Sequence, residues 1–249
     1  MKKLVVIITI LILFIPKVNA STSSASSYIL MDSTTGRVLM SKDMHTKRLI
    51  ASITKIMTAT IAIESGKLDD IVTVDESVLK AYGSGIYIEV GEEIKLKDLV
   101  YGLMLRSGND AAAMIANYVS GSDEEFVNLM NNKAKELGMK NTIFYNPSGL
   151  PTPHGNYSSV YDMALLTRYA MKNDAYREIV GTKKYKVTTN KKTYVWNNKN
   201  KLLRYDYITG GKTGYTEESG RTLVSTADID NMKLIVVTIR DSDDWNTHI

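Results

Sequence analysis

A serine and a lysine lie three residues apart at Ser52 and Lys55. Residues with this spacing on a helix share one face, with Cβ atoms about 5–6 Å apart, so the hydroxyl and the amine can meet. A serine hydroxyl is a weak nucleophile unless a base lies beside it. Burial among apolar neighbours and near other cations would lower the pKa of Lys55 and let it act as that base. The pair therefore predicts a nucleophilic serine that a lysine activates.

The same spacing recurs at Ser77 and Lys80, so the pattern alone does not identify the nucleophile. Taken by itself, either serine is more often a surface or helix-capping residue. The segment 56–62 is apolar and predicts a buried helix behind Ser52, whereas Ser77 lies in a mixed, acidic stretch. A helix N-terminus would also offer backbone N–H groups to a developing oxyanion. We therefore assign the nucleophile to Ser52.

Two further short motifs follow, Ser107-Gly108-Asn109 and then Lys212-Thr213-Gly214. Each has a structural explanation when taken alone, because the first could cap a helix at 110–119 and the second could end a strand with a turn glycine. A fixed cation such as Lys212 on a strand edge would also suit a substrate that ends in a carboxylate. An extended peptide could pair along that edge as an added strand. The order of the three motifs favours one shared site.

This order resembles that of the penicillin-recognising serine enzymes, whose signature includes Ser-x-x-Lys and Lys-Thr-Gly. Within that group the chain is similar to the D-alanyl-D-alanine carboxypeptidases, the low-molecular-mass penicillin-binding proteins, which carry the Ser-Gly-Asn variant. The similarity extends from about 28 to 249. Its further matches are the segments 50–55, 107–112, 146–150, 162–165, 200–203 and 211–216.

The resemblance implies that Ser52 attacks the carbonyl between the two terminal D-alanines of a peptidoglycan stem peptide. An acyl-enzyme would form, D-alanine would leave, and water would release the shortened stem. Lys55 would be the base, Ser107 would relay a proton to the leaving amine, and Asn109 would bind the substrate amide and hold Lys55. β-Lactams would be covalent inhibitors, and no cofactor is implied.

The third motif would bind the end of the substrate. By resemblance, Lys212 and Thr213 would hold the terminal carboxylate, and Gly214 would let the strand lie against the peptide. The oxyanion hole would consist of the N–H of Ser52 and that of Thr216.

One loop departs from the family pattern. Many relatives carry a histidine directly before a Ser-Ser or Ser-Thr pair, whereas here Asn156 and Tyr157 precede that pair and His154 lies upstream. We therefore expect His154 to be a surface residue.

Two other functions compete with the carboxypeptidase. A class A β-lactamase needs a deacylating glutamate between the second and third motifs, and no carboxylate occurs between Glu136 and Asp162. A non-catalytic β-lactam sensor or wall-binding domain could share the scaffold. The intact motif set argues against such a domain, and so does the absence of a transmembrane span after the N-terminal segment.

Residues 1–20 resemble a secretory signal peptide, with a charged start, an apolar run and a small-residue cleavage site. The run at 4–16 is shorter than the roughly 20 residues that span a bilayer. An uncleaved anchor and membrane association therefore stay open.

Cleavage would remove three lysines and no acid, which leaves a net charge of +1. A net charge this small does not indicate the basic surface with which proteins bind nucleic acid. We expect export to the outer face of the cytoplasmic membrane or the cell wall, and a role in peptidoglycan biosynthesis and cell shape.

The cysteine, histidine and lysine content indicates which other kinds of site to expect. The chain has no cysteine and three distant histidines, so we expect no disulfide and no metal site. The segment 183–201 carries seven lysines between aromatic residues. It predicts either a site for an anionic wall polymer or a solvated hairpin.

Periodicity places these motifs on an α/β (α+β) fold. A hairpin is expected at 28–41, a helix from Ser52 to a glycine cap at Gly66, and strands at 222–227 and 233–239. Further helices are expected near 96–105, 111–119, 122–137 and 161–170. One domain, 21–249, would combine an antiparallel sheet from about 28–50 and 205–240 with a helical part at about 52–180, as in β-lactamases and transpeptidases. The segment 241–249 looks like a helix start, so we expect a final helix to be missing.

Overall fold

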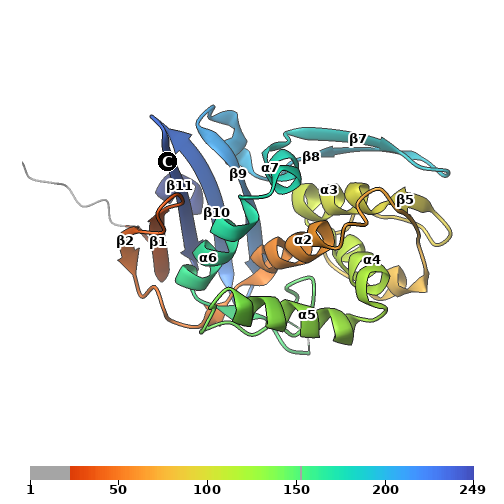
Figure 1. The fold of residues 1–249 in the computed structure, drawn as a ribbon, viewed down its shortest axis with the longest axis horizontal. Coiled ribbons are helices and arrows are strands. Elements are labelled where there is room, and N and C mark those ends of the chain that lie inside the picture. The colour runs from red at the N-terminus through yellow and green to blue at the C-terminus, as the bar shows by residue number, and fades with distance from the viewer. Residues whose placement is uncertain (1–22, 152) are drawn as a thin grey trace, which may run out of the picture.

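The computed structural model describes residues 23–151 and 153–249. The predicted signal peptide, 1–20, lies outside them. Both ends of the described chain contribute to one five-stranded sheet with the order β2-β1-β11-β10-β9 (Figure 1). Its strands are β1 (Ser27–Asp32), β2 (Val38–Lys42), β9 (Ile208–Thr216), β10 (Gly220–Ile229) and β11 (Met232–Ile239). All neighbouring strands are antiparallel, which confirms the expected fold class.

Strand pairing explains how the two chain ends meet. β1 pairs with β11 along its whole length, from Ser27 opposite Ile239 to Asp32 opposite Leu234. Alternate residues of β1 are buried, as expected for a strand with one face on the core. β9 forms an outer edge of the sheet, and an edge strand keeps one row of backbone groups free for another chain.

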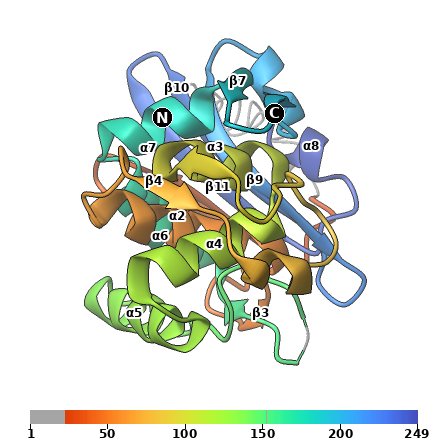
Figure 2. The same cartoon turned by 90° about the vertical axis from the view of Figure 1, so that its right-hand side faces the viewer.

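The helices lie beside the sheet. Figure 1 shows α6 next to the strands, and Figure 2 shows α3 and α4 in front of the sheet when the molecule is seen from the helical side. The helices are α2 (Lys55–Glu64), α3 (Leu96–Arg106), α4 (Asn109–Ser120), α5 (Asp123–Glu136), α6 (Val160–Ala170), α7 (Asp174–Gly181) and α8 (Asp244–Thr247). In the part of the chain that the structure describes, no helix is long and apolar enough to cross a membrane.

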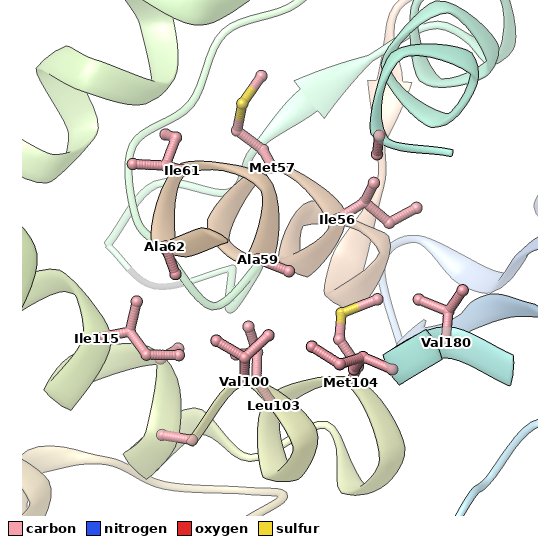
Figure 3. Close-up of a cluster of buried hydrophobic side chains, with 14 of the residues drawn as sticks. Ile56, Met57, Ala59, Ile61, Ala62, Val100, Leu103, Met104, Ile115 and Val180 are labelled. Carbon is pink, nitrogen blue, oxygen red and sulfur yellow. The ribbon is translucent and has the colours of Figure 1, made fainter. Parts of the chain in front are cut away.

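The central helix is α2, which contacts α3, α4, α5, α6 and α7. Its residues from Lys55 to Ile63 are all buried, as expected for a helix that is enclosed on every side. Figure 3 shows its apolar side chains packed against Val100, Leu103 and Met104 of α3. The helix therefore holds the residues before it at a fixed place in the core.

Short elements complete the fold. Three two-stranded ladders pair β3 (Arg48–Leu49) with β6 (Tyr157–Ser158), β4 (Ile71–Thr73) with β5 (Glu93–Lys95), and β7 (Lys184–Thr188) with β8 (Thr193–Asn197). The 3₁₀ turns are η1 (Ala51–Thr54), η2 (Glu76–Lys80) and η3 (Lys201–Arg204). The lysine-rich segment is thus a hairpin, and it buries Tyr194 and Trp196 on one face.

The structure differs from the sequence prediction at three places. Ser52 lies in η1, where Ala51 has a positive φ of 48°, and the α-helix begins only at Lys55. Helix α7 was not expected, although the side chain of Asn173 caps it. A short helix, α8, forms within the segment that resembled a helix start.

Leu103 should be essential for the packing of α2 on α3. Its side chain is 0% exposed, so Leu103→Ala should lower the free energy of unfolding by about 2–5 kcal/mol, through lost burial and the cavity that remains. Leu129 on α5 is 41% exposed, and Leu129→Ala is the matched control, with an expected change within about 0.5 kcal/mol. Urea unfolding monitored by circular dichroism measures both. Equal losses in the two variants would contradict this description of the core.

Candidate active site

The Ser-x-x-Lys motif lies where η1 runs into α2, and its lysine is fully buried. The Nζ atom of Lys55 donates to Ser52 Oγ at 3.1 Å, to Asn109 Oδ1 at 2.8 Å and to the carbonyl oxygen of Ser148 at 2.5 Å. The first two motifs are therefore in direct contact. The third acceptor is a backbone atom of the loop before α6.

Burial holds the pKa of Lys55 well below its usual value of 10.5. The nearby positive charges of Lys212 and Lys199 lower it further, while Asp110 acts in the opposite direction. A lysine whose charged form is disfavoured in this way can be neutral near pH 7. The neutral amine can then accept a proton from the hydroxyl beside it.

The loop segments 146–151 and 153–156 are tied to η1 and to the start of α2 by several contacts. Thr58 Oγ1 donates to the carbonyl of Pro147 at 2.6 Å, and the side-chain amide of Asn156 donates to Thr54 Oγ1 at 3.0 Å. Gly149 has a φ of +84°, and a Cβ atom there would lie 2.0 Å from the carbonyl oxygen of Ala51. Only glycine fits this close approach. The loop therefore delivers the Ser148 carbonyl to Lys55.

The Ser-Gly-Asn motif forms the sharp turn between α3 and α4. Ser107 has a left-handed backbone with a φ of 63°, which is uncommon for a residue with a side chain. The backbone N–H of Asn109 donates to the carbonyl of Ser84 at 2.7 Å, and its side-chain amide donates to the carbonyl of Tyr82 at 2.6 Å. This turn therefore aims Ser107 and Asn109 at the same site.

Lys212 of β9 links the sheet to the helical wall. Its Nζ donates to Ser107 Oγ at 3.1 Å and to the carbonyl of Thr213 at 2.7 Å. Its side chain is buried, and burial, helped by the charge of Lys199, lowers its pKa to about 7. The structure thus brings all three predicted motifs to one place.

Gly214 lets β9 lie against the nucleophile turn. A Cβ atom at this position would be 2.9 Å from the backbone nitrogen of Ser52 and 2.4 Å from Thr222 Oγ1. Such contacts are too short for any side chain, so a residue other than glycine would push the strand away. The edge of β9 therefore runs beside the N–H of Ser52.

The geometry corrects the expectation for Thr216. Its N–H donates to Ser219 Oγ at 3.1 Å, and the residue pairs with Gly220 of β10. Successive backbone groups along a strand point in opposite directions within the sheet. The N–H that faces away from β10 is therefore that of Tyr215. The sequence did not show this, because the register and the Ser219 contact belong to the folded hairpin.

An open cleft of about 390 Å³ runs along this edge, lined by Ser52, Ser107, Thr213 and Gly214. It also contains two cations that the sequence analysis did not select, Lys199 and Arg221. Lys199 donates to Ser84 Oγ at 3.1 Å, and burial lowers its pKa. Lys199 directly precedes the matched segment 200–203, which was the available signal.

A larger cavity lies away from the three motifs. A groove of about 740 Å³ beside α5 contains none of the predicted site residues, so size alone does not identify the site. In the second Ser-x-x-Lys copy, Ser77 Oγ contacts Met114 Sδ at 3.4 Å. Among the residues that the structure describes, Ser77 and Lys80 are not joined by a hydrogen bond. His154 is exposed, as expected, with its ring beside that of Tyr145.

Comparison with known proteins gives the family. The sequence pattern of peptidase family S11, described as D-alanyl-D-alanine carboxypeptidase, matches residues 16–243. The D-alanyl-D-alanine carboxypeptidase DacF of Bacillus subtilis is 40% identical over 220 residues, which cover 86% of this chain and 56% of that protein.

Solved structures give the same result. A D-alanyl-D-alanine carboxypeptidase from Mycobacterium tuberculosis superposes with a TM-score of 0.87 at 26% identity, covering 94% of this chain and 95% of that one. A variant of the Streptomyces K15 DD-transpeptidase gives 0.86 at 31% identity, covering 92% and 98%. The chain spans a little over half the length of the first relatives, 56% and 58%. With its motifs assembled in one cleft, the chain belongs to the D-alanyl-D-alanine carboxypeptidase family.

Proposed function

We propose that this protein is a serine DD-carboxypeptidase that removes the terminal D-alanine from peptidoglycan stem peptides. The observation that carries this proposal is the buried Lys55 amine, 3.1 Å from Ser52 Oγ and enclosed by groups from three separate segments. A domain that only binds the cell wall has no use for such an arrangement, because burying an amine costs several kcal/mol. This argues against the wall-binding alternative.

The first half of the reaction forms an acyl-enzyme. Neutral Lys55 takes the proton of Ser52, and Oγ attacks the carbonyl carbon of the peptide bond between the two D-alanines. The oxyanion that develops is stabilised by the N–H groups of Ser52 and Tyr215. Asn109 binds the substrate amide with the amide hydrogen that Tyr82 does not use.

Departure of D-alanine completes the acyl-enzyme, and hydrolysis of the acyl-enzyme is the second half. Ser107, held by Lys212, relays a proton to the leaving amine, so free D-alanine departs with its own carboxylate. Lys212 adds positive potential around that carboxylate, and the Thr213 hydroxyl lies in the same cleft. One water molecule then attacks the acyl carbonyl, which regenerates Ser52 and gives the shortened stem.

β-Lactams would acylate Ser52 by the same attack and stay bound. The loop before α6 offers Lys55 only the carbonyl oxygen of Ser148, and the sequence between Glu136 and Asp162 has no acid to activate a water. Slow deacylation of the penicilloyl-enzyme follows from this, in contrast to a class A β-lactamase.

Ser52→Ala should abolish covalent labelling by benzylpenicillin and lower D-alanine release about 10³-fold or more, because the attacking atom is removed. Ser77→Ala, which changes the second Ser-x-x-Lys copy, is the matched control and should retain both activities. Intact mass and peptide mapping locate the adduct, and an enzymatic D-alanine assay measures turnover. An adduct on Ser77, or none on the native protein, would disprove the assignment.

The pH dependence should be bell-shaped. Acylation needs neutral Lys55, so the rate rises as pH increases through its lowered pKa. The charge on Lys212, whose pKa is about 7, is lost above that pH, so kcat/KM for a carboxylate-terminated peptide should then fall. The two values belong to the coupled pair. Steady-state rates between pH 5 and 10, with the same peptide as its methyl ester for comparison, test this. Identical descending limbs for both substrates would contradict the role given to Lys212.

We infer that residues 1–20 direct export, which would place the domain 21–249 beside its substrate at the cell wall. The motif of charged start, apolar run and small-residue site supports this. Protein produced from the full sequence in a bacterium should be recovered outside the cytoplasm with Ser21 as its first residue, as read by mass spectrometry. Retention of 1–20 on membrane-bound protein would instead favour an uncleaved anchor.

A further inference from the structure

A second cavity adjoins the catalytic residues on the helical side of the molecule. This space, the α4 cavity, measures about 480 Å³ and is lined by Asn109 and Ser148, the two residues whose oxygens accept hydrogen bonds from Lys55. Ala113 and Asn117 also line it. Residues four apart on a helix share one face, and eight residues of α-helix rise about 12 Å. The cavity therefore extends from the catalytic lysine along one face of α4.

The other walls of the α4 cavity are the turn η2 and the loop before α6. The start of η2 is fixed to α4, because the side-chain amide of Asn117 donates to Asp75 Oδ2 at 2.5 Å. The same carboxylate accepts from the backbone N–H of Ser77 at 2.8 Å. The loop wall is held by the carbonyl of Pro147, which accepts from Thr58 Oγ1. Hydrogen bonds between separate segments thus maintain the shape of the cavity.

Two opposite charges line the α4 cavity without pairing with each other. Lys80, the lysine of the second Ser-x-x-Lys copy, comes from η2, and Asp123 is the first residue of α5. Of the ion pairs between residues that the structure describes, none contains either group. Desolvation by the surrounding protein raises the pKa of Asp123, and the charge of Lys80 acts in the opposite direction. The two charges therefore act on the same space.

Asn109 relates the α4 cavity to the substrate. One hydrogen of its side-chain amide is donated to the carbonyl of Tyr82, and the other is available to an amide carbonyl of the bound peptide. The residue that precedes D-Ala-D-Ala then lies beside Asn109, which also lines the cavity. A long side chain at that position can extend toward Lys80 and Asp123, whereas a short one cannot reach them.

We propose that the α4 cavity binds the side chain of the residue before D-Ala-D-Ala and selects a zwitterionic end, with Lys80 contacting its carboxylate and Asp123 its ammonium group. This rests on the proposed function, because it names the kind of stem peptide that the site prefers. A neutral side chain would leave both charges of the cavity unmatched, and opposite charges that match across an interface give specificity. The lysine of the second Ser-x-x-Lys copy thus has a binding role that does not involve Ser77.

The test compares two peptides that differ only in this side chain. One carries 2,6-diaminopimelic acid before D-Ala-D-Ala, so that its side chain ends in both charges. The other carries Nε-acetyl-lysine, whose side chain has neither charge. The native protein should release D-alanine from the first peptide with a kcat/KM about 10-fold higher, mostly through KM, because two charged contacts near the surface are each of modest strength. Equal values for the two peptides would overturn the proposal.

Variants of the two charges assign this preference to the cavity. Lys80→Gln and Asp123→Asn should each lower kcat/KM about 3- to 5-fold more for the diaminopimelate peptide than for the acetyl-lysine peptide. Glu124→Gln is the matched control, because Glu124 is also an exposed acid in the first turn of α5 but does not line the cavity. Its ratio should equal that of the native protein. Thermal unfolding of each variant shows whether the fold persists.

Two results with these variants would overturn the proposal. Equal losses on both peptides would show that Lys80 and Asp123 affect the fold or the catalytic residues and not the side chain. An unchanged ratio in both variants would place the side chain outside the α4 cavity.

Binding of the same two peptides to the Ser52→Ala protein separates this proposal from the proposed function, because binding needs no turnover. Isothermal calorimetry should give about 10-fold tighter binding of the diaminopimelate peptide, and adding Lys80→Gln should reduce that ratio. If the native protein releases no D-alanine from either peptide, the proposed function fails while the binding ratio still tests the cavity. Equal dissociation constants, or no binding of either peptide, would overturn the α4 cavity as a binding site even in an active enzyme.

Discussion

The buried amine of Lys55 is the constraint on which the rest of the site depends. Moving an amine out of water costs free energy unless its N–H groups have hydrogen-bond acceptors and its positive charge is removed or paired. Its acceptors come from η1, from the start of α4 and from the loop before α6. These segments are held together by the packing of the helical part. The element that joins the core to the site is α2, which contacts five other helices.

A second buried lysine, Lys212, affects which groups of the site are protonated. Lys212 approaches from the sheet, and its positive charge lowers the pKa of Lys55. Two buried amines close to each other resist being charged together. Ser107 lies against Lys212, and Asn109 lies against Lys55. The Ser-Gly-Asn turn therefore separates the two amines and contacts each of them, which explains why it requires the strained backbone at Ser107.

Side-chain patterns predicted the sheet and most helices, and the resemblance to the family supplied the residues that meet at Lys55. They could not reveal the carbonyl of Ser148, because a backbone oxygen leaves no residue-type signal. Arg221 was missed because its contact with Asp244, 23 residues away in the sequence, exists only in the folded chain. The N–H of Thr216, expected in the oxyanion hole, donates instead to Ser219, a contact that depends on the strand register of the folded hairpin. The sequence analysis therefore missed features that depend on backbone atoms or on contacts between residues far apart in the sequence.

The two Ser-x-x-Lys copies show what turns a motif into a site. Both occupy 3₁₀ turns, yet Ser77 contacts a methionine sulfur whereas Ser52 contacts a buried amine. The difference lies in what surrounds each copy: a buried helix follows Ser52, and Gly149 and Gly214 allow a loop and a strand edge to close on it.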